Sequence, residues 1–162
     1  MGIMSYQKAK AKKVRNELLI DGLKTRAGIK SEPFPILKVK LDKAFSELVR
    51  LKGTDLDGWE KCVTCKSWGH WKSMDCGHFV DRDHLPTRWD LDNCRPQCQK
   101  CNRFKTGRRY EFGMALNREL GYGTAERLIE KGSGPSQHIK DTAQELLEDI
   151  KSKLNVEKKR FK

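Results

Sequence analysis

The sequence predicts an α+β fold in which amphipathic helices flank a small, metal-stabilised centre. Two cysteine pairs, Cys62-x2-Cys65 and Cys98-x2-Cys101, have the spacing with which four thiolates close one tetrahedral zinc site. Apolar residues recur at helical intervals on both sides of these pairs, and Gly, Asp and Trp are frequent between them. Only 36% of the residues are hydrophobic and 35% are charged, so a zinc ion should contribute to folding.

Two helices are predicted on the N-terminal side of this centre. The first covers 6–28 and has a crowded basic start. A stiff, extended linker containing two prolines, 31–35, follows it. The second helix, 37–51, has an i, i+3, i+4, i+7, i+8 apolar stripe that we interpret as core packing. The stripe consists of Leu41, Ala44, Phe45, Leu48 and Val49.

The sequence of the centre predicts only short strands, loops and the start of one helix. Residues 75–80 are typical of a short strand, 81–89 of a loop containing Pro86, and a helix is expected to begin near Cys98. Long helices are not expected before that point, because Gly, Asp and short polar runs interrupt any apolar period.

Three further helices are predicted after the centre. They cover 108–120, 124–131 with Thr124 as the N-cap, and 137–154. The basic tail, 157–162, is predicted to be disordered. The chain then divides into a basic N-terminal helix and linker (1–36), a zinc-containing domain (37–131), and a C-terminal helix with its tail (132–162).

The net charge of +12 at pH 7 is unevenly distributed. Residues 100–109 are strongly basic and contain no acidic residue, whereas 75–92 is rich in Asp. A basic strip beside an acidic segment suits a site that grips phosphates around a metal ion, so DNA is the expected partner. A solvated helix face is the alternative reading of such a charge run. The basic residues are Lys100, Arg103, Lys105, Arg108 and Arg109.

Other environments are disfavoured by the sequence. No apolar run approaches the roughly 18 residues of a membrane span, and no signal peptide is evident, so a cytoplasmic protein without a membrane or small-molecule partner is expected. Paired cysteines without an export signal predict metal ligands in a reducing compartment. Cys76 and Cys94 remain, and we interpret them as small buried packing residues, with a ligand role as the less expected alternative.

His78, Asn93 and Asn102 lie inside the cysteine frame, at intervals of 15 and 9 residues. A structural zinc site has no need of them, whereas a metal-dependent nuclease does. Together with Asp75 they resemble the HNH (His-Me finger) nucleases, in which a two-stranded hairpin and a helix form a ββα-metal core around one ion. Asn102 directly follows the second cysteine pair, a placement similar to that in endonuclease VII, a phage resolvase of branched DNA.

The resemblance extends to the phage NinG family between about residue 37 and residue 131. It is carried by Asp75–Phe79, Arg88–Asp90, Asn93, Gln97–Asn102 and Gly107. It implies a zinc-stabilised ββα-metal core flanked by amphipathic helices. It also implies an endonuclease of the host cytoplasm that cuts branched recombination intermediates such as Holliday junctions and D-loops.

Chemical roles follow for the matching residues. Neutral His78 could take a proton from the attacking water, and the Asn93 amide could fix the His78 ring or its loop. Asp75 and Asn102 offer hard oxygen ligands for Mg²⁺ or Mn²⁺. The basic strip at 100–109 could hold the flanking phosphates.

Two departures from the HNH pattern matter. Gly77 stands where many HNH enzymes carry an acidic ligand, so Asp75 is expected to reach the ion across the space that Gly77 leaves, with a surface carboxylate as the alternative. His84, in Asp83-His84-Leu85-Pro86, is a rival base with a similar local pattern. It lies only nine residues before Asn93, too close for the intervening loop and strand, so we predict His78 as the base and His84 as a loop residue near DNA.

Two other functions fit part of the pattern. A non-catalytic, zinc-dependent DNA-binding protein would share the cysteines and the charge but not the need for the His and Asn residues. A zinc-dependent protein adaptor would bind DNA weakly and without steep salt dependence. Cutting both strands of a junction favours a homodimer, built by apolar stripes such as 41–49 or 139–154, although these stripes could also pack within one chain.

Overall fold

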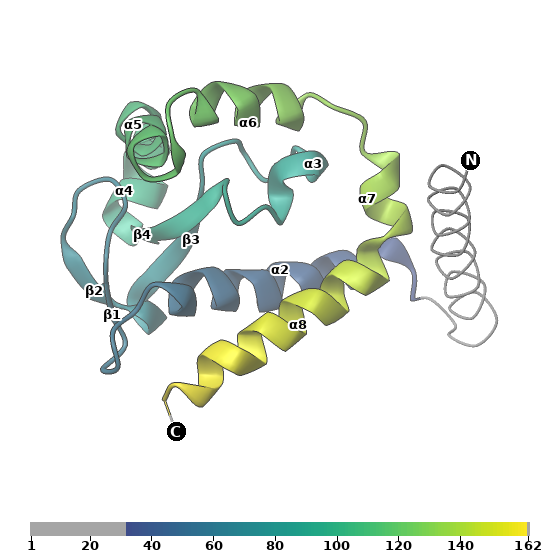
Figure 1. Cartoon of the computed structure of the whole chain (residues 1–162), viewed down its shortest axis with the longest axis horizontal. Helices are drawn as coiled ribbons and strands as arrows, with labels where there is room; N and C mark the ends of the chain where they lie inside the picture. The colour runs from purple at the N-terminus through teal and green to yellow at the C-terminus, as the bar shows by residue number, and fades with distance from the viewer. Residues whose placement is uncertain (1–31, 162) are drawn as a thin grey trace, which may run out of the picture. The chain divides into compact units, whose positions relative to one another are not determined.

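A computed structural model of the protein describes residues 32–161 as a mixed α+β arrangement with two small antiparallel sheets (Figure 1). The helix predicted over 6–28 lies outside the described residues. The strands are β1 (Trp59–Lys61), β2 (Trp68–His70), β3 (Met74–His78) and β4 (Cys94–Cys98). The helices are α2 (Phe34–Lys52), α3 (Leu85–Arg88), α4 (Gln99–Phe104), α5 (Arg109–Leu120), α6 (Thr124–Gly132), α7 (Gln137–Asp141) and α8 (Ala143–Lys159), with short 3-10 turns η1 (Trp71–Ser73) and η2 (Thr106–Arg108).

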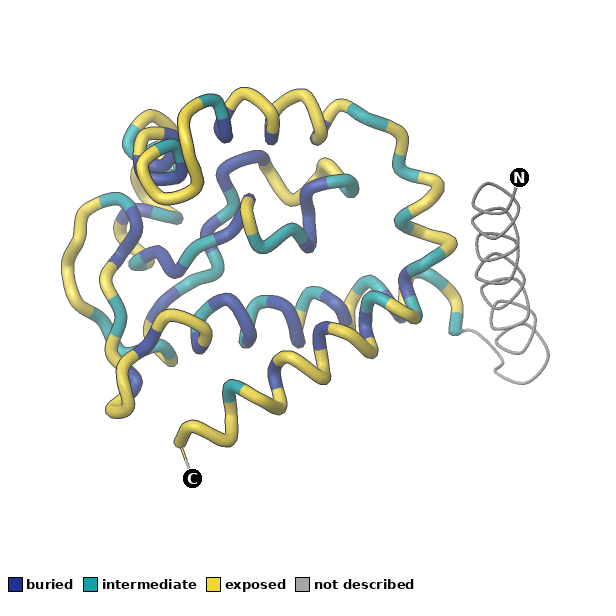
Figure 2. The backbone as a smooth tube through the Cα atoms, in the orientation of Figure 1, coloured by how far each residue is buried: buried dark blue, intermediate teal, exposed yellow. Residues whose placement is uncertain are grey.

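Helix α8 packs along α2, and the two share the larger apolar core (Figure 1). The predicted stripe of α2 is buried because residues at these intervals lie on one helical face. Figure 2 shows buried residues recurring along both helices. The apolar stripes are therefore used for packing within one chain, and a dimer would need another surface. The α8 side chains in this core include Ala143, Leu147, Ile150 and Leu154.

A smaller apolar core joins α5 and α6 to the residues that follow β3. The β3–β4 hairpin thus lies between α2 and the α5–α6 pair (Figure 1). Gly113 permits this contact, since a Cβ there would lie 3.0 Å from the Phe79 ring. The core residues are Val63, Phe79, Val80, Phe112, Ala115, Leu116, Ala125 and Leu128.

The register of β3 and β4 decides which side chains share a face. Met74 lies opposite Cys98, and His78 lies opposite Cys94. Because side chains alternate along a strand, Cys76 and His78 share a face with Cys94, and Asp75 lies on the other face. The soft donors of Cys76, His78 and Cys94 therefore lie on one face of the hairpin, and the hard carboxylate of Asp75 lies on the other.

Several predicted elements differ from the observed ones. The 81–89 loop contains the short helix α3, because Pro86 fits the first turn of a helix, where no N–H donor is needed. Thr124 was expected as an N-cap, but Gly123, with φ of 82°, holds that position. The Thr124 hydroxyl instead donates to the Gly121 carbonyl at 2.7 Å.

The C-terminal region also corrects the prediction. The single helix expected over 137–154 is divided into α7 and α8 at Thr142. The tail was predicted to be disordered from residue 157, yet α8 continues to Lys159. A contact distant in sequence helps to hold this end, since Arg160 Nη2 donates to the Thr54 carbonyl at 2.8 Å.

The described residues from Pro33 onward form one compact unit. Within it α8 shares a core with α2, while the domain boundaries predicted at 36 and 131 stay predictions. Between residues 32 and 161, none of the helices combines the length and apolar character needed to cross a bilayer.

Candidate functional site

Four cysteines converge where the β1–β2 turn meets the junction of β4 and α4. Their sulfur atoms all lie within 4.8 Å of one another, and the Cys65 and Cys98 sulfurs are 3.8 Å apart. Zn–S bonds of about 2.3 Å arranged as a tetrahedron place sulfurs about 3.8 Å apart. The Cys98 backbone N–H also donates to Cys62 Sγ at 3.4 Å. The donor set and its spacing therefore fit one metal ion bound by Cys62, Cys65, Cys98 and Cys101.

The ionisation of these thiols also calls for a cation. Burial raises the pKa of Cys65, but hydrogen bonds with Ser67, Cys62 and Cys101 together outweigh it and lower the pKa to about 6. Burial and the neighbouring Cys101 and Cys62 sulfurs raise the pKa of Cys98 to about 12. One thiolate thus opposes the ionisation of the next, and a bound cation would relieve that repulsion.

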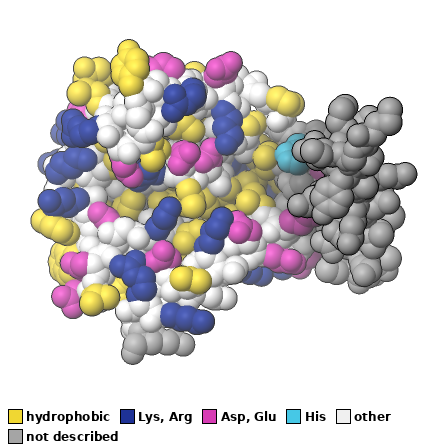
Figure 3. Space-filling view, in the orientation of Figure 1, with side chains coloured by type: hydrophobic (Ala, Val, Ile, Leu, Met, Phe, Trp, Pro, Cys, Tyr) yellow, Lys and Arg dark blue, Asp and Glu magenta, His cyan; other side chains and the backbone are white. Residues whose placement is uncertain are grey.

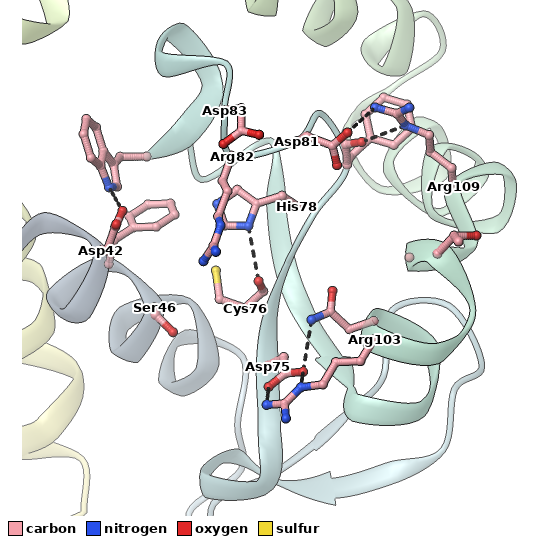
Figure 4. A pocket seen from close by; sticks show the side chains of 16 residues that line it. Asp42, Ser46, Asp75, Cys76, His78, Asp81, Arg82, Asp83, Arg103 and Arg109 are labelled. Carbon is pink, nitrogen blue, oxygen red and sulfur yellow. Dashed lines mark hydrogen bonds and ion pairs between the residues drawn. The ribbon is translucent and has the colours of Figure 1, made fainter. Parts of the chain in front are cut away.

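A cavity of about 780 Å³ opens beside the cysteine cluster, between α2, β3 and α4 (Figure 4). Three of the four predicted reactive side chains line it: Asp75, His78 and Asn102. Arg103 and Arg109 from the predicted basic strip line it as well. The fold therefore brings a carboxylate, an imidazole, an amide and two guanidinium groups into one polar cavity.

Asp75 and Asn102 are in direct contact. Asn102 Nδ2 donates to Asp75 Oδ2 at 3.0 Å, and Arg103 binds both carboxylate oxygens, at 2.8 and 2.7 Å (Figure 4). Burial acts to raise the pKa of Asp75, but hydrogen bonds from Arg103 and Asn102 outweigh it and lower the pKa. Asp75 is therefore a charged carboxylate. Because the Arg103 side chain is 56% exposed, it can leave for another anion without a large desolvation cost.

His78 is held between two backbone carbonyls. Its Nε2 lies 3.0 Å from the Arg88 oxygen and its Nδ1 lies 3.2 Å from the Cys76 oxygen. A neutral ring carries one N–H, so the shorter contact favours a proton on Nε2 and leaves the lone pair on Nδ1. Burial and the nearby Arg88 and Arg82 guanidinium groups lower the pKa of His78, although the two carbonyl contacts act to raise it. The ring is thus neutral at pH 7 and can accept a proton.

Asn93 holds the loop that follows His78 rather than the His78 ring. Its side chain is completely buried. Asn93 Oδ1 accepts from the Val80 N–H at 2.8 Å, and Nδ2 donates to the Val80 and Thr87 carbonyls at 2.9 and 3.0 Å. These hydrogen bonds fix the backbone on both sides of the loop, immediately before the Arg88 carbonyl that contacts His78.

Sequence reasoning missed the partner that orients this loop, Asp42 of α2. Arg88, which is 5% exposed, donates to both Asp42 oxygens at 2.8 and 2.6 Å, and Trp89 Nε1 donates to Oδ1 at 2.9 Å. The Arg88-Trp89 pair was visible as part of the family pattern, but its partner lies 46 residues earlier. These contacts connect α2 to the carbonyl that holds His78.

Gly77 is required by its neighbour across the hairpin. A Cβ at Gly77 would lie 2.5 Å from Gln97 Oε1 and 2.9 Å from Gln97 Cβ. The space that Gly77 leaves, across which Asp75 is expected to reach the ion, is therefore filled by Gln97. Gln97 Nε2 donates to the Gly107 carbonyl at 2.7 Å and to Thr64 Oγ1 at 3.2 Å, which joins the cysteine turn to η2, directly before α5.

The predicted basic strip is partly engaged in ion pairs. Arg103 pairs with Asp75, Arg108 with Glu111, and Arg109 with Asp81 at 3.4 Å. The last two predicted members, Lys100 and Lys105, are exposed. Figure 3 shows Lys and Arg side chains gathered along the left edge of the view, over the side that carries α4 and the β1–β2 hairpin. Of the basic strip, Arg103 and Arg109 line the cavity.

The remaining histidine and cysteine candidates are clearly placed. His84 is exposed at the start of α3, where its Nδ1 lies 3.1 Å from the Gly132 carbonyl. Cys94 is 2% exposed in the α2–α8 core, as predicted, whereas Cys76 is only partly buried, packs against that core and lines the cavity. Burial raises the pKa of Cys94 well above its usual range, as does the adjacent Cys76. The spacing of the chain had given no reason to group these cysteines with His78.

Comparisons with known proteins identify the family. No curated protein and no solved structure matches the chain. A family model described as bacteriophage lambda NinG protein matches residues 4–160, nearly the whole sequence. Residues of the family motifs form hydrogen bonds around the cavity. Arg88 donates to Asp42, and Gln97 donates to the Gly107 carbonyl. On the extent of that match, the chain belongs to the bacteriophage lambda NinG protein family.

Proposed function

We propose that this protein is a metal-dependent HNH-type endonuclease that hydrolyses phosphodiesters in branched DNA such as Holliday junctions and D-loops. The observation that carries the proposal is the cavity lined by Asp75, His78 and Asn102. In the ββα-metal arrangement, β3, β4 and α4 supply the hairpin and the helix. The branched substrate rests on the family and on its resemblance to phage resolvases.

Two metal sites are part of this proposal. The four cysteines would hold a structural Zn²⁺, which suits a closed thiolate site. Asp75 and Asn102 would hold Mg²⁺ or Mn²⁺, since both ions prefer oxygen ligands. The contact between these side chains at 3.0 Å supports a shared ligand role. When bound, the divalent ion supplies positive charge to the scissile phosphate and the leaving oxygen.

His78 is the proposed general base. With its Nε2 proton directed to the Arg88 carbonyl, Nδ1 carries the lone pair that would take a proton from water, in exchange for its 3.2 Å contact with the Cys76 carbonyl. Asn93 positions the loop that presents this carbonyl, and the Arg88–Asp42 contacts hold the loop against α2. These groups preserve the orientation of the ring.

Arg103 has two proposed positions. In the described structure it pairs with Asp75, whereas a metal ion on that carboxylate would release the guanidinium to a flanking phosphate. Lys100, Lys105 and Arg109 extend the phosphate-binding surface. We further propose a homodimer, because paired cuts across a junction suit twofold symmetry. Its interface would lie outside the buried α2 and α8 stripes.

Cleavage of a labelled four-way DNA junction, with a matched linear duplex, tests the proposal. We expect junction-selective cutting with Mg²⁺ or Mn²⁺, lost in His78→Ala but retained in His84→Ala, the control histidine. Junction binding should persist in both variants at equal zinc content. Equal loss in both variants, or unchanged cutting by His78→Ala, would remove His78 from the mechanism.

A non-catalytic DNA-binding function is the second candidate. The observation that favours it is the Arg103–Asp75 pair, which occupies both carboxylate oxygens. Tight, salt-sensitive junction binding by the wild type, with no cutting under either metal, would support this alternative. Sedimentation of the free and DNA-bound protein as a monomer would overturn the dimer.

A further inference from the structure

A second group of metal-binding side chains lies on the β3–β4 hairpin, apart from the four-cysteine cluster. Cys76, His78 and Cys94 each place a ligand atom within 4.8 Å of the other two. His78 and Cys94 lie directly opposite in the register, and Cys76 is two residues before His78 on the same face. Three donors from two strands thus converge on one point.

The chemistry of this group differs from that of the proposed catalytic metal site. Thiolate sulfur and imidazole nitrogen favour zinc, cobalt or cadmium, whereas Asp75 and Asn102 offer oxygen and favour magnesium or manganese. Three protein ligands with an open fourth position form a recognised zinc coordination type. Tetrahedral bonds to S and N require donor separations of about 3.5 Å, and the three donor atoms lie within 4.8 Å of one another without an ion.

The orientation of His78 also suits a metal ligand. Histidines that bind zinc commonly direct their other ring N–H to a backbone carbonyl. His78 Nε2 lies 3.0 Å from the Arg88 carbonyl, so Nδ1 is the ring nitrogen that would bind an ion, in exchange for its 3.2 Å contact with the Cys76 carbonyl. Cys76 and His78 both line the cavity, and Figure 4 shows the Cys76 sulfur beside the His78 ring. An ion can therefore enter from the cavity while the buried Cys94 closes the site from behind.

We propose that Cys76, His78 and Cys94 form a second soft-metal site, and that zinc bound there inhibits the protein by occupying the lone pair of His78. The metal site stands on the geometry of the three side chains alone. The inhibition rests on the proposed function, because it assumes that His78 accepts a proton during cleavage. Two thiolates would balance the charge of a divalent ion, and the nearby Arg88 is already paired with Asp42.

The second site binds zinc more weakly than the four-cysteine cluster. It has three protein ligands instead of four, and binding must remove a proton from the buried Cys94 thiol. Zinc should therefore fill the four-cysteine cluster first, and a chelator should empty the second site first. Low zinc would leave the nuclease active, and excess zinc would suppress it.

Cobalt(II) titration of the reduced, full-length protein counts the sites without any measure of cleavage. We expect two tetrahedral, thiolate-bound equivalents in the wild type, the second weaker. Cys76→Ser and Cys94→Ala should each lose the weaker equivalent, whereas His84→Ala should keep both. Saturation of the wild type at one equivalent, or a Cys76→Ser/Cys94→Ala double variant that still takes two, would overturn the site.

Cadmium NMR of the wild type gives a second measurement that does not depend on how well the variants fold. Two resonances are expected, one for four sulfurs and one for mixed sulfur and nitrogen ligands, and a four-sulfur resonance alone would overturn the proposal. In the cleavage assay, zinc beyond one equivalent should slow the wild type but not Cys76→Ser. Two bound metals with equal zinc sensitivity in both proteins would overturn the inhibition and leave the site. A wild type that never cuts would overturn the proposed nuclease function instead.

Discussion

The α2–α8 layer buries aliphatic and aromatic side chains, whereas the centre around β3 and β4 buries thiols and polar side chains. In the layer, Leu41, Phe45 and Leu147 are at most 2% exposed and need only a close apolar contact. In the centre, Asn93 and Gln97 are completely buried and need specific hydrogen-bond partners. The two regions touch, but they are stabilised by different interactions.

The two kinds of interaction suit different roles: mechanical support in the α2–α8 layer, and precise placement of side chains in the centre. Apolar contacts tolerate small displacements, so the helical layer can act as a platform. Hydrogen bonds and metal ligands fix positions more narrowly, which is what the proposed general base and the proposed metal sites require. Perturbations that act on polar groups or metal ions should therefore affect the centre first and the helical layer little.

Metal removal should produce the largest separation between the two regions. Replacing Cys62 and Cys101 by Ser, or adding a strong chelator, should lower the free energy of unfolding by about 5 kcal/mol or more. Both thiols are almost fully buried, at 0% and 2% exposure, so their loss would leave the centre without the proposed zinc cross-link. Thermal circular dichroism, with zinc content measured in parallel, checks this.

Leu147→Ala is the matched change in the helical layer. It should cost about 2–5 kcal/mol through lost burial and a residual cavity, with no change in zinc content. A chelator should reduce the stability of Leu147→Ala and wild type equally. A wild type that contains no zinc and ignores the chelator would contradict the metal-dependent half of the comparison.

Asn93→Ala should give the next largest effect. It leaves the Val80 N–H and the Val80 and Thr87 carbonyls without their partner, and each buried unsatisfied group costs about 1–3 kcal/mol. Asn117→Ala is the control, since its Oδ1 only caps the Ala125 N–H at a partly buried site, and it should cost about 1 kcal/mol. Equal losses for both in urea unfolding would show that Asn93 has no special structural role.

Gly77→Ala tests the packing across the hairpin. The new Cβ would collide with Gln97, so we expect a loss of about 1–3 kcal/mol from overpacking. In the Gln97→Ala background the same change should cost less, because the 2.5 Å clash with Oε1 is removed while the 2.9 Å approach to the Cβ of residue 97 remains. A double-mutant cycle measures this coupling, and additive losses would mean that the hairpin relieves the clash elsewhere.

The elements that the sequence predicted well are those with local causes. Helix α2 followed from its apolar period, and the cysteine cluster followed from the two Cys-x2-Cys spacings. The end of α8 was missed because its support, the Arg160 contact with the Thr54 carbonyl, spans 106 residues. The helix α3 was missed because four residues are too few to establish a period.

The candidate site also contains features that local sequence predicts and features that only the fold reveals. The residues to consider, including Asp75, His78 and Asn102, could be selected by type and spacing, and the fold gathers them around one cavity. The Asp42–Arg88 contact and the Cys76–His78–Cys94 group could not be predicted, because both depend on tertiary contacts or strand register. Residue types indicate a chemistry, whereas register and long-range contacts decide which groups can take part in it.

The smallest expected effect concerns Asp42, which joins the two regions. Burial acts to raise its pKa, but hydrogen bonds from Arg88 and Trp89 outweigh it, so the pKa of Asp42 in the folded protein lies below its ordinary value. A carboxylate with a lowered pKa contributes stability that is fully present above its unfolded pKa and is lost as the pH falls through the folded value. Asp42→Asn removes this contribution at neutral pH while keeping the shape of the side chain.

The stability difference between wild type and Asp42→Asn should therefore be constant near neutrality and shrink as the pH falls below about 4. Other carboxylates with lowered pKa, such as Asp75 and Glu111, titrate in both proteins and cancel in the difference. Urea unfolding of both proteins at a series of pH values measures this difference in the free energy of unfolding. The difference should be modest, because the Asp42 side chain is 39% exposed. A difference that grows on acidification would mean that Asp42 is protonated more readily in the folded protein, and that Arg88 is held in place by α2 packing instead of by its charge.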